Sequence, residues 1–475
     1  MVDRTVDMVI EGGKIISPEC TVEANIAVDG GVIVAVGAGP TMPAARETID
    51  ASGMLVLPGI IDSHVHFREP GYEYKEDWRS GTAAAACGGV TSVFEMPNTH
   101  PPTGTVEELA RKQNIAANSA HVDYGIYGLL DENNLDQLEP MAAAGAAGFK
   151  CFMGNTFGNL PAPSDGAMLE GFEILARLGK RCVVHAENWS IMARREAQLQ
   201  DAGRSDPLAH LAARPAVCAM EAVSRATIFA EWTGARLHIA HKSSGDGLHF
   251  VRDAKARGVD VTVETCPQYL LLSSDDMAQK RGIMRVNPPI REPGHAEALW
   301  QGLHDGAVDM MATDHAPHQP DEKTQPDIWK CDCGFPGVET AVPLMLTQVN
   351  AGRMTINQYV RWSSFNPARA WGLYPRKGAI QTGADADFAI VNLGQSATID
   401  QARLHSKSHI APWHGHDVRG MPVCTIVRGR VVARDGELVG EPGWGRPVPQ
   451  EMPPATPRNV DKTSAAIVRP ALAAE

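Results

Sequence analysis

The chain has 475 residues, 44% of them hydrophobic and 21% charged, a composition typical of a globular protein whose core needs no disulfide bonds. The formal net charge of −13 and the lack of a strong basic run argue against nucleic acid or an anionic membrane as the main partner, although a small anionic substrate stays possible. No apolar run approaches a membrane span, and the N-terminus lacks the apolar core of a signal peptide, so we expect a cytoplasmic protein whose nine cysteines are reduced.

Residues 1–57 predict short β-strands. The runs DMVIEGGKIIS, NIAVDGGVIVAVG and MLVLPG are rich in β-branched residues and are interrupted by glycine. The DGG within the second run suits a tight hairpin turn. We expect this segment to form the first part of a small β-sandwich.

From residue 58 onward, short apolar runs alternate with alanine-rich helical patterns. The eight apolar runs span residues 59–66, 89–98, 122–130, 146–153, 181–188, 235–241, 259–265 and 307–315. Eight alternations of strand and helix predict an α/β fold, a TIM-like (β/α)8 barrel, over residues 58–375. That span exceeds the roughly 250 residues typical of the fold, so we expect insertions. They are expected near residues 154–178, 189–214 and 316–336.

The β-rich pattern returns after the last barrel helices. The runs KGAIQTGADADFAIVNL and VCTIVRGRVVARDGELV contain glycine and aspartate at expected turns. We expect residues 376–443 to complete the β-sandwich, so that both chain ends build it. Residues 444–475 are rich in proline and show no periodicity, which predicts a partly ordered C-terminal arm.

Ionisable side chains terminate several of the eight runs, where a barrel of this kind places its active site. The candidates are His64, His66, Lys150, His185, His241 and Asp314. Each has an ordinary explanation, because a histidine can be satisfied in a core, a lysine can pair with an acid, and an aspartate can cap a helix. Four imidazoles and a carboxylate at one end of one barrel nevertheless predict a site for zinc or a similar divalent ion.

Five motifs in this order resemble the cyclic-amidohydrolase group of the amidohydrolase superfamily. They read GIIDSHVHFREPG, FKCFMG, VVHAEN, LHIAHKSS and ATDHAPH, and the resemblance extends from about residue 8 to about residue 435. The group includes dihydroorotases, allantoinases, hydantoinases and dihydropyrimidinases. The resemblance implies a hydrolase of carbon–nitrogen bonds in cyclic amides that forms a homo-oligomer, either a dimer or a tetramer.

The same resemblance implies two divalent metal ions, with zinc as the default. One ion would be held by His64, His66 and Asp314, and the other by His185 and His241. Lys150, carbamylated to N6-carboxylysine, would bridge both ions, since a bare ammonium has donors but no acceptor. Asp314 would also be catalytic, accepting a proton from the attacking water and passing it to the leaving nitrogen.

Four further residues are candidates for substrate contacts, namely Arg68, Asn98, Asn287 and His318. In dihydroorotases the first-strand motif reads H-x-H-x-R and an asparagine lies in MPNT, and both hold the substrate carboxylate. His318 would be a third carboxylate contact, whereas Asn287 and the backbone near residues 334–340 would hold the ring amides. Alternatively, Arg68 could pair with Glu69 or Glu73, and Asn98 could cap the next helix.

We therefore expect a dihydroorotase, acting on dihydroorotate and N-carbamoyl-aspartate. Segments such as VVHAENWSIMARREA and GFPGVETAVPLML look at least as much like allantoinases and hydantoinases. An allantoinase or a hydantoinase/dihydropyrimidinase-type hydrolase therefore remains open. A catalytically inactive structural paralogue is a further alternative, which the retention of all six ligand positions disfavours. The expected partner is a small, carboxylate-bearing cyclic amide, with no nucleic acid and no membrane.

Overall fold

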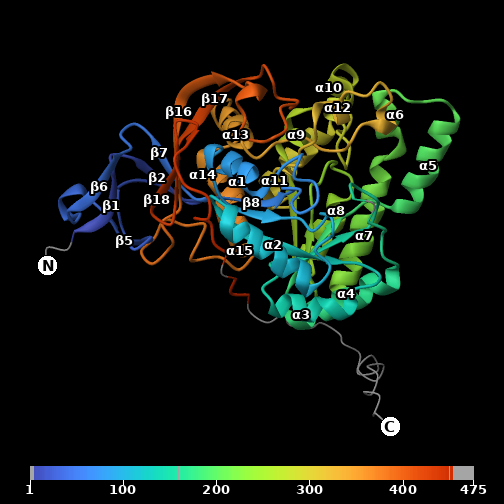
Figure 1. Cartoon of the computed structure of the whole chain (residues 1–475), viewed down its shortest axis with the longest axis horizontal. Helices are drawn as coiled ribbons and strands as arrows, with labels where there is room; N and C mark the ends of the chain where they lie inside the picture. The colour runs from blue at the N-terminus through green and yellow to red at the C-terminus, as the bar shows by residue number, and fades with distance from the viewer. Residues whose placement is uncertain (1–4, 159, 449, 453–475) are drawn as a thin grey trace, which may run out of the picture.

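Eight parallel strands, hydrogen-bonded in chain order, form the main sheet of the protein (Figure 1). The computed structural model describes residues 5–158, 160–448 and 450–452. The strands are β8 (Ile60–Val65), β9 (Val90–Glu95), β10 (Asp123–Leu130), β11 (Gly148–Phe152), β12 (Arg181–His185), β13 (Arg236–Ile239), β14 (Val261–Thr265) and β15 (Met310–Met311). A bridge between Val65 and His315 joins the last strand to the first, which confirms the predicted (β/α)8 barrel.

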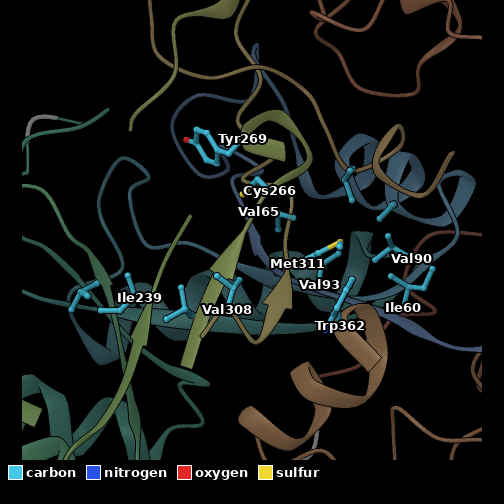
Figure 2. Packing of buried hydrophobic residues seen from close by; sticks show 14 of the residues in the cluster. Ile60, Val65, Val90, Val93, Ile239, Cys266, Tyr269, Val308, Met311 and Trp362 are labelled. Carbon is cyan, nitrogen blue, oxygen red and sulfur yellow. The ribbon is translucent and has the colours of Figure 1, made fainter. Parts of the chain in front are cut away.

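The barrel strands are apolar because both of their faces are covered. Every residue of β8, β9, β10, β11, β12 and β13 is buried. A parallel sheet with helices outside and side chains inside leaves no face in water, so its strands read as continuous apolar runs instead of alternating ones. Figure 2 shows one part of the resulting core, where Ile60, Val90 and Trp362 belong to a single buried cluster.

Helices separate the strands and cover the outside of the barrel. They are α1 (Trp78–Cys87), α2 (Val106–Ser119), α3 (Leu138–Ala143), α4 (Asp165–Leu178), α5 (Trp189–Asp201), α6 (Pro207–Ala213), α7 (Ala216–Thr233), α8 (Leu248–Ala256), α9 (Pro267–Leu271), α10 (Ser274–Lys280), α11 (His295–Asp305), α12 (Pro320–Lys323), α13 (Ala341–Asn350), α14 (Ile356–Val360) and α15 (Asn366–Ala370). Local signals set their ends: the Asp77 side chain accepts from Ser80 N at the start of α1, and Gly179, at φ 66°, ends α4. Within the described residues, no helix combines the length and apolar character needed to cross a membrane.

A separate pair of β-sheets lies beside the barrel (Figure 1). One sheet has the order β5 (Val32–Gly37), β4 (Asn25–Asp29), β1 (Val6–Glu11) and β6 (Ala45–Asp50). The other has the order β19 (Glu437–Leu438), β18 (Arg430–Arg434), β17 (Asp417–Val427), β16 (Phe388–Thr398), β7 (Leu55–Pro58), β2 (Lys14–Ile16) and β3 (Thr21–Glu23). Because β7 pairs directly with β16, the chain ends share one sheet, as predicted. The exact division at residues 57, 375 and 443 stays a prediction.

The segment that follows the β-sheets returns to the barrel. Tyr124 N donates to Arg446 O at 2.9 Å, and Val448 N donates to Tyr124 O at 2.8 Å. These two bonds tie the start of the predicted arm 444–475 to the start of β10. Residues 453–475 of that arm lie outside the described residues.

Candidate active site

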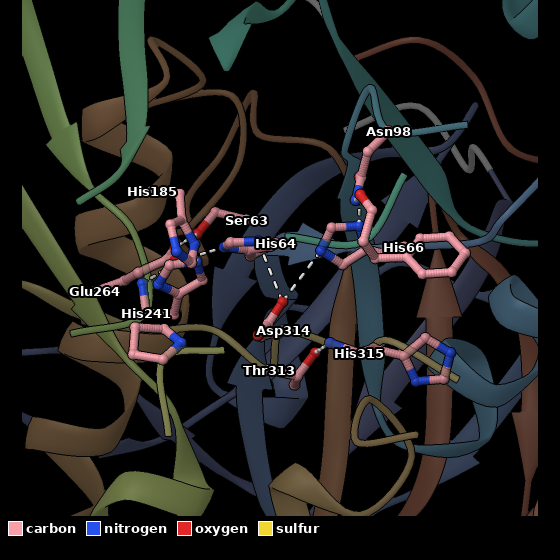
Figure 3. A network of polar contacts seen from close by, with 12 residues as sticks. Ser63, His64, His66, Asn98, His185, His241, Glu264, Thr313, Asp314 and His315 are labelled. Carbon is pink, nitrogen blue, oxygen red and sulfur yellow. Dashed lines mark hydrogen bonds and ion pairs between the residues drawn. The ribbon is translucent and has the colours of Figure 1, made fainter. Parts of the chain in front are cut away.

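A single pocket at the C-terminal ends of the barrel strands is bordered by all six predicted metal ligands. These are His64, His66, Lys150, His185, His241 and Asp314, which come from five strands or the turns directly after them. Figure 3 shows four of the imidazoles and the aspartate directed toward one another. The barrel therefore brings together residues that are up to 250 positions apart in the chain.

His64, His66 and Asp314 form the tightest group. Asp314 Oδ1 lies 3.3 Å from His64 Nε2 and 3.1 Å from His66 Nε2. One potential ligand atom from each residue falls within 4.8 Å of the others, and all three side chains are buried. Two imidazoles and a carboxylate in this arrangement could hold a divalent metal ion.

Neighbouring polar groups orient these two imidazoles from behind. His64 Nδ1 donates to Glu264 Oε1, and His66 Nδ1 donates to Asn98 Oδ1 at 2.7 Å. The Nε2 lone pair of each ring then faces the pocket, since its Nδ1 carries the proton. Such partners fix the tautomer and the direction of a metal-binding histidine.

His185 and His241 form a second group across the pocket. His185 Nδ1 lies 2.9 Å from His241 Nε2, and the rings of His64 and His241 are 5.0 Å apart. His185 Nε2 contacts Glu187 Oε2 at 2.9 Å, and Glu187 is also paired with Arg214. The buried Glu187–Arg214 ion pair thus holds His185 in place beside His241, close to the first group.

Lys150 lies on β11 with its side chain fully buried. Its ammonium nitrogen has no hydrogen-bond partner, although it lies 5.3 Å from the centre of the Phe152 ring. Burial lowers the pKa of Lys150, which increases the fraction of neutral amine. A buried amine without partners fits the predicted carbamate, because a carboxylated lysine would offer oxygen ligands at this position.

Burial also sets the charge states of the remaining ligands. It lowers the pKa of His64 to about 4, with a further contribution from Lys150, and it raises the pKa of Asp314. The pKa values of His66 and His241 lie well below the usual value, again mainly through burial. Neutral imidazoles keep their lone pairs available, so the donor set fits a divalent cation.

The backbone is strained at three of these positions. Arg68, His241 and Asp314 have positive φ angles of 65°, 34° and 52°. Side chains with a Cβ rarely adopt this region, and such strain collects at sites where it orients functional groups. The turns after β8, β13 and β15 therefore direct these three side chains into the pocket.

Arg68 provides a buried positive charge beside the imidazoles. Its Nε donates to Pro317 O at 3.2 Å, and its Nη2 lies 3.0 Å from His318 Nε2. The guanidinium carbon lies 4.4 Å from the centre of the Phe157 ring, and Nη1 has no hydrogen-bond partner. Neither Glu69 nor Glu73 pairs with this guanidinium within the described part of the chain, so one donor remains available to a ligand.

The other predicted substrate contacts lie at different depths. Asn98 and Asn287 border the pocket, and the Asn287 side-chain oxygen is buried without a partner. Asn98 is engaged by His66 and by the Phe157 carbonyl at 3.3 Å. His318 lies behind Arg68, outside the set of residues that border the pocket. Their roles as substrate contacts stay predictions.

Two residues at the site, Glu264 and Phe157, are not predicted from the sequence to be functional. Glu264 is the second-last residue of β14, the seventh barrel strand, and it makes hydrogen bonds with His64, His238 and Ser63. Its position close to the C-terminal end of a barrel strand is a signal in the sequence. No sequence motif predicts that Phe157 lies over Arg68.

Comparisons with known proteins agree with this geometry. The model of the amidohydrolase family matches residues 55–432. An allantoinase from Rubrobacter xylanophilus is 40% identical over 440 residues, covering 92% of this chain and 96% of that protein. A dihydroorotase from Geobacter sp. is 35% identical over 432 residues, covering 90% and 100%. The solved structure of L-hydantoinase (dihydropyrimidinase) from Arthrobacter aurescens superposes with a TM-score of 0.91 at 36% identity, covering 94% of this chain and 100% of that one.

The match covers the barrel together with the adjoining strands of the β-sheets, and the relatives align over nearly their full length. The pocket lies where this fold places its chemistry. The chain therefore belongs to the amidohydrolase family and is a hydrolase of cyclic amides.

Proposed function

We propose that this enzyme opens the ring of dihydroorotate, and forms it from N-carbamoyl-aspartate in the reverse direction. The observation that carries the proposal is Arg68, a buried guanidinium with one unpartnered nitrogen at the border of the pocket. The free Nη1 of this guanidinium can donate a charge-assisted hydrogen bond to a carboxylate, and such a bond is strong where water is excluded. Dihydroorotate has a carboxylate on its ring, whereas allantoin and hydantoin have none.

The six ligand residues are proposed to hold two divalent metal ions, with zinc as the default and N6-carboxylysine at Lys150. His64, His66 and Asp314 would contact one ion, and His185 and His241 the other. When bound, the ions would activate a water molecule and polarise the ring carbonyl. The support for this assignment is the donor set itself, together with the buried Lys150 amine that has no partner.

Asp314 is the proposed proton carrier. Its carboxylate borders the pocket beside His64 and His66, within reach of a water molecule bound between these side chains, and an ionised carboxylate can accept a proton and release it again. It would take the proton of the attacking water and deliver it to the ring nitrogen as the carbon–nitrogen bond breaks. The hydroxyl adds to the carbonyl carbon, so the product is an open-chain carboxylate and the atoms of one water are accounted for.

Arg68 would hold the ring carboxylate while Asn287 contacts the ring amides. The Phe157 ring packs against the guanidinium and covers it from solvent, which strengthens a charge-assisted bond. Burial lowers the pKa of Arg68 to about 10, so the guanidinium is still charged at neutral pH. The site thus combines a fixed positive charge with a hydrolytic centre.

The test is a set of assays with purified, metal-loaded enzyme on dihydroorotate, allantoin, dihydrouracil and hydantoin. We expect the highest kcat/KM for dihydroorotate. In Arg68→Met, KM for dihydroorotate should rise about 100-fold, equivalent to roughly 2–3 kcal/mol for a lost charged hydrogen bond. Activity on the uncharged rings should change little. Equal losses on charged and uncharged rings would exclude the carboxylate contact.

Allantoin is a second candidate substrate, which the 40% identity to an allantoinase favours. Native activity on allantoin that exceeds activity on dihydroorotate would select it. Zinc as the metal, a cytoplasmic location and a dimer or tetramer also remain predictions.

A further inference from the structure

The loop between β16 and β17 reaches from the β-sheet domain to the active-site end of the barrel. Residues 405–408 of this loop read HSKS, and they contact the barrel segments before α13, between β8 and α1, and between β15 and α12. Ser406 and Ser408 are 2% and 0% exposed, although they lie in a connecting loop. Burial of two serines in a loop indicates a specific docked position, because each hydroxyl needs a partner.

Three of the four residues bind the loops that flank the pocket. His405 N donates to Glu339 Oε2 at 2.8 Å, which holds the loop before α13. Ser406 Oγ donates to Glu76, a fully buried carboxylate in the loop between β8 and α1. Lys407 Nζ donates to Glu73 O at 2.7 Å in that same loop. Residues 405–407 therefore hydrogen-bond to both the loop before α13 and the loop between β8 and α1.

Ser408 reaches the third loop and, through it, Arg68. Its hydroxyl donates to His318 O at 2.6 Å, in the segment between β15 and α12. The same backbone supplies Pro317 O to Arg68 Nε at 3.2 Å, and the His318 ring lies against Arg68 Nη2. Pro317 and His318 thus make two of the contacts that orient the guanidinium, and Ser408 binds the backbone carbonyl of His318.

We propose that residues 405–408 position Arg68 for substrate binding, with Ser408 as the positioning residue that acts through the backbone of residues 317–318. The inference rests on the proposed role of Arg68 as a substrate contact. Ser408 does not border the pocket and touches no reacting atom. Its effect should therefore appear in substrate binding, and only while Arg68 is present.

A double-mutant cycle between Ser408→Ala and Arg68→Met tests this, with KM and kcat measured on the holoenzyme for dihydroorotate and hydantoin. Loss of one hydrogen bond should raise KM for dihydroorotate about three- to tenfold, with kcat nearly unchanged. In the Arg68→Met background, Ser408→Ala should cause no further rise, since coupled residues are not additive. Ser408→Cys keeps the size and a weak donor, and it should give a smaller rise.

Ser396→Ala, at an exposed serine on β16, is the matched control and should leave KM unchanged. Additive effects of Ser408 and Arg68, or equal rises for dihydroorotate and hydantoin, would overturn the positioning role and indicate a general structural one. Failure of the proposed function looks different, because native enzyme would then not open dihydroorotate. In that case the cycle is run on the ring that it does open, and additivity, or an unchanged KM in Arg68→Met, again overturns the inference.

Discussion

The two ends of the barrel both contain buried charged groups, but they satisfy them differently. At the end opposite the pocket, Lys377 Nζ lies 2.7 Å from Asp123, 3.2 Å from Asp385 and 2.5 Å from Asp387. Asp123 also pairs with Arg428 and accepts from Arg446 N at 2.9 Å. Each of the three carboxylates there has the Lys377 cation within 3.2 Å, although Asp385 Oδ2 makes no hydrogen bond within the described residues.

At the pocket end, Glu264 pairs with His64 and Glu187 with Arg214, but other buried polar atoms lack such compensation. The Lys150 amine and His241 Nδ1 are buried without hydrogen-bond partners, and the His185 and His241 rings lie edge to face with their centroids 4.6 Å apart. Burying unpaired polar groups costs free energy, which a protein tolerates where a ligand completes them. We therefore expect the Lys377 cluster to stabilise the fold, whereas the unpartnered groups of the pocket fit the proposed ion-binding role.

Lys150→Ala should produce the largest change at the pocket end. Removing the proposed bridge should abolish binding of two metal ions and reduce activity to background, while the free energy of unfolding changes little. Metal analysis of the purified variant by mass spectrometry, together with ring-opening assays, measures both. Short carboxylic acids should partly restore activity, because they replace the missing ligand oxygens. Full activity in the variant would argue against the bridge.

Asp314→Asn should reduce kcat by several orders of magnitude. The amide cannot accept the proton that the mechanism requires, but its size and shape are nearly those of the carboxylate. Steady-state kinetics and a melting curve should separate the two effects, with Tm close to the native value. A kcat within tenfold of native would show that another group carries the proton.

Lys377→Met should act at the other end of the barrel and show the opposite pattern. Three buried carboxylates would lose their shared cation, and breaking such a cluster typically costs about 3–5 kcal/mol. Urea unfolding should show this loss, whereas kcat/KM of the folded fraction should stay near native. A loss of kcat/KM without a loss of stability would contradict a purely structural role for the Lys377 cluster.

The pH dependence of stability gives the smallest expected effect. Burial raises the pKa of Glu322, but hydrogen bonds from His318 and Gln319 N and the contact with Lys75 lower it to about 2. Because the folded pKa is depressed, this contribution is present above about pH 4.5 and is lost as the pH falls toward 2. Glu322→Gln should flatten that loss by about 1 kcal/mol, since the carboxylate is partly exposed and screened. The measurement is urea unfolding at a series of pH values. The same decrease in the free energy of unfolding between pH 4.5 and 2 in the native protein and in Glu322→Gln would contradict this prediction.

The sequence predicts the barrel and the proximity of the candidate ligand residues for physical reasons, whereas their binding of metal stays a prediction. Parallel strands buried on both faces leave continuous apolar runs, so β8 and its seven successors are visible as such. Residues at the C-terminal ends of the strands lie at the same end of a closed barrel. The proximity of His64, His185 and Asp314 can therefore be predicted from their positions in the sequence. The order of elements alone carries this information.

Contacts made by loops could not be predicted in the same way. The bond between Ser408 and His318 joins positions 90 residues apart, and the position of Phe157 over Arg68 depends on how a loop folds back. The complete cluster around Lys377 needs three aspartates from two separated segments. No periodicity or terminal position marks such pairs, because tertiary packing alone brings them together.

The most direct measurement is a crystal structure of protein purified with zinc and bicarbonate, with anomalous diffraction data collected at the zinc edge. We expect two anomalous peaks among His64, His66, His185, His241 and Asp314, with extra carboxylate density on the amine of Lys150. An absence of peaks at these side chains, or metal bound beside an unmodified lysine, would contradict it.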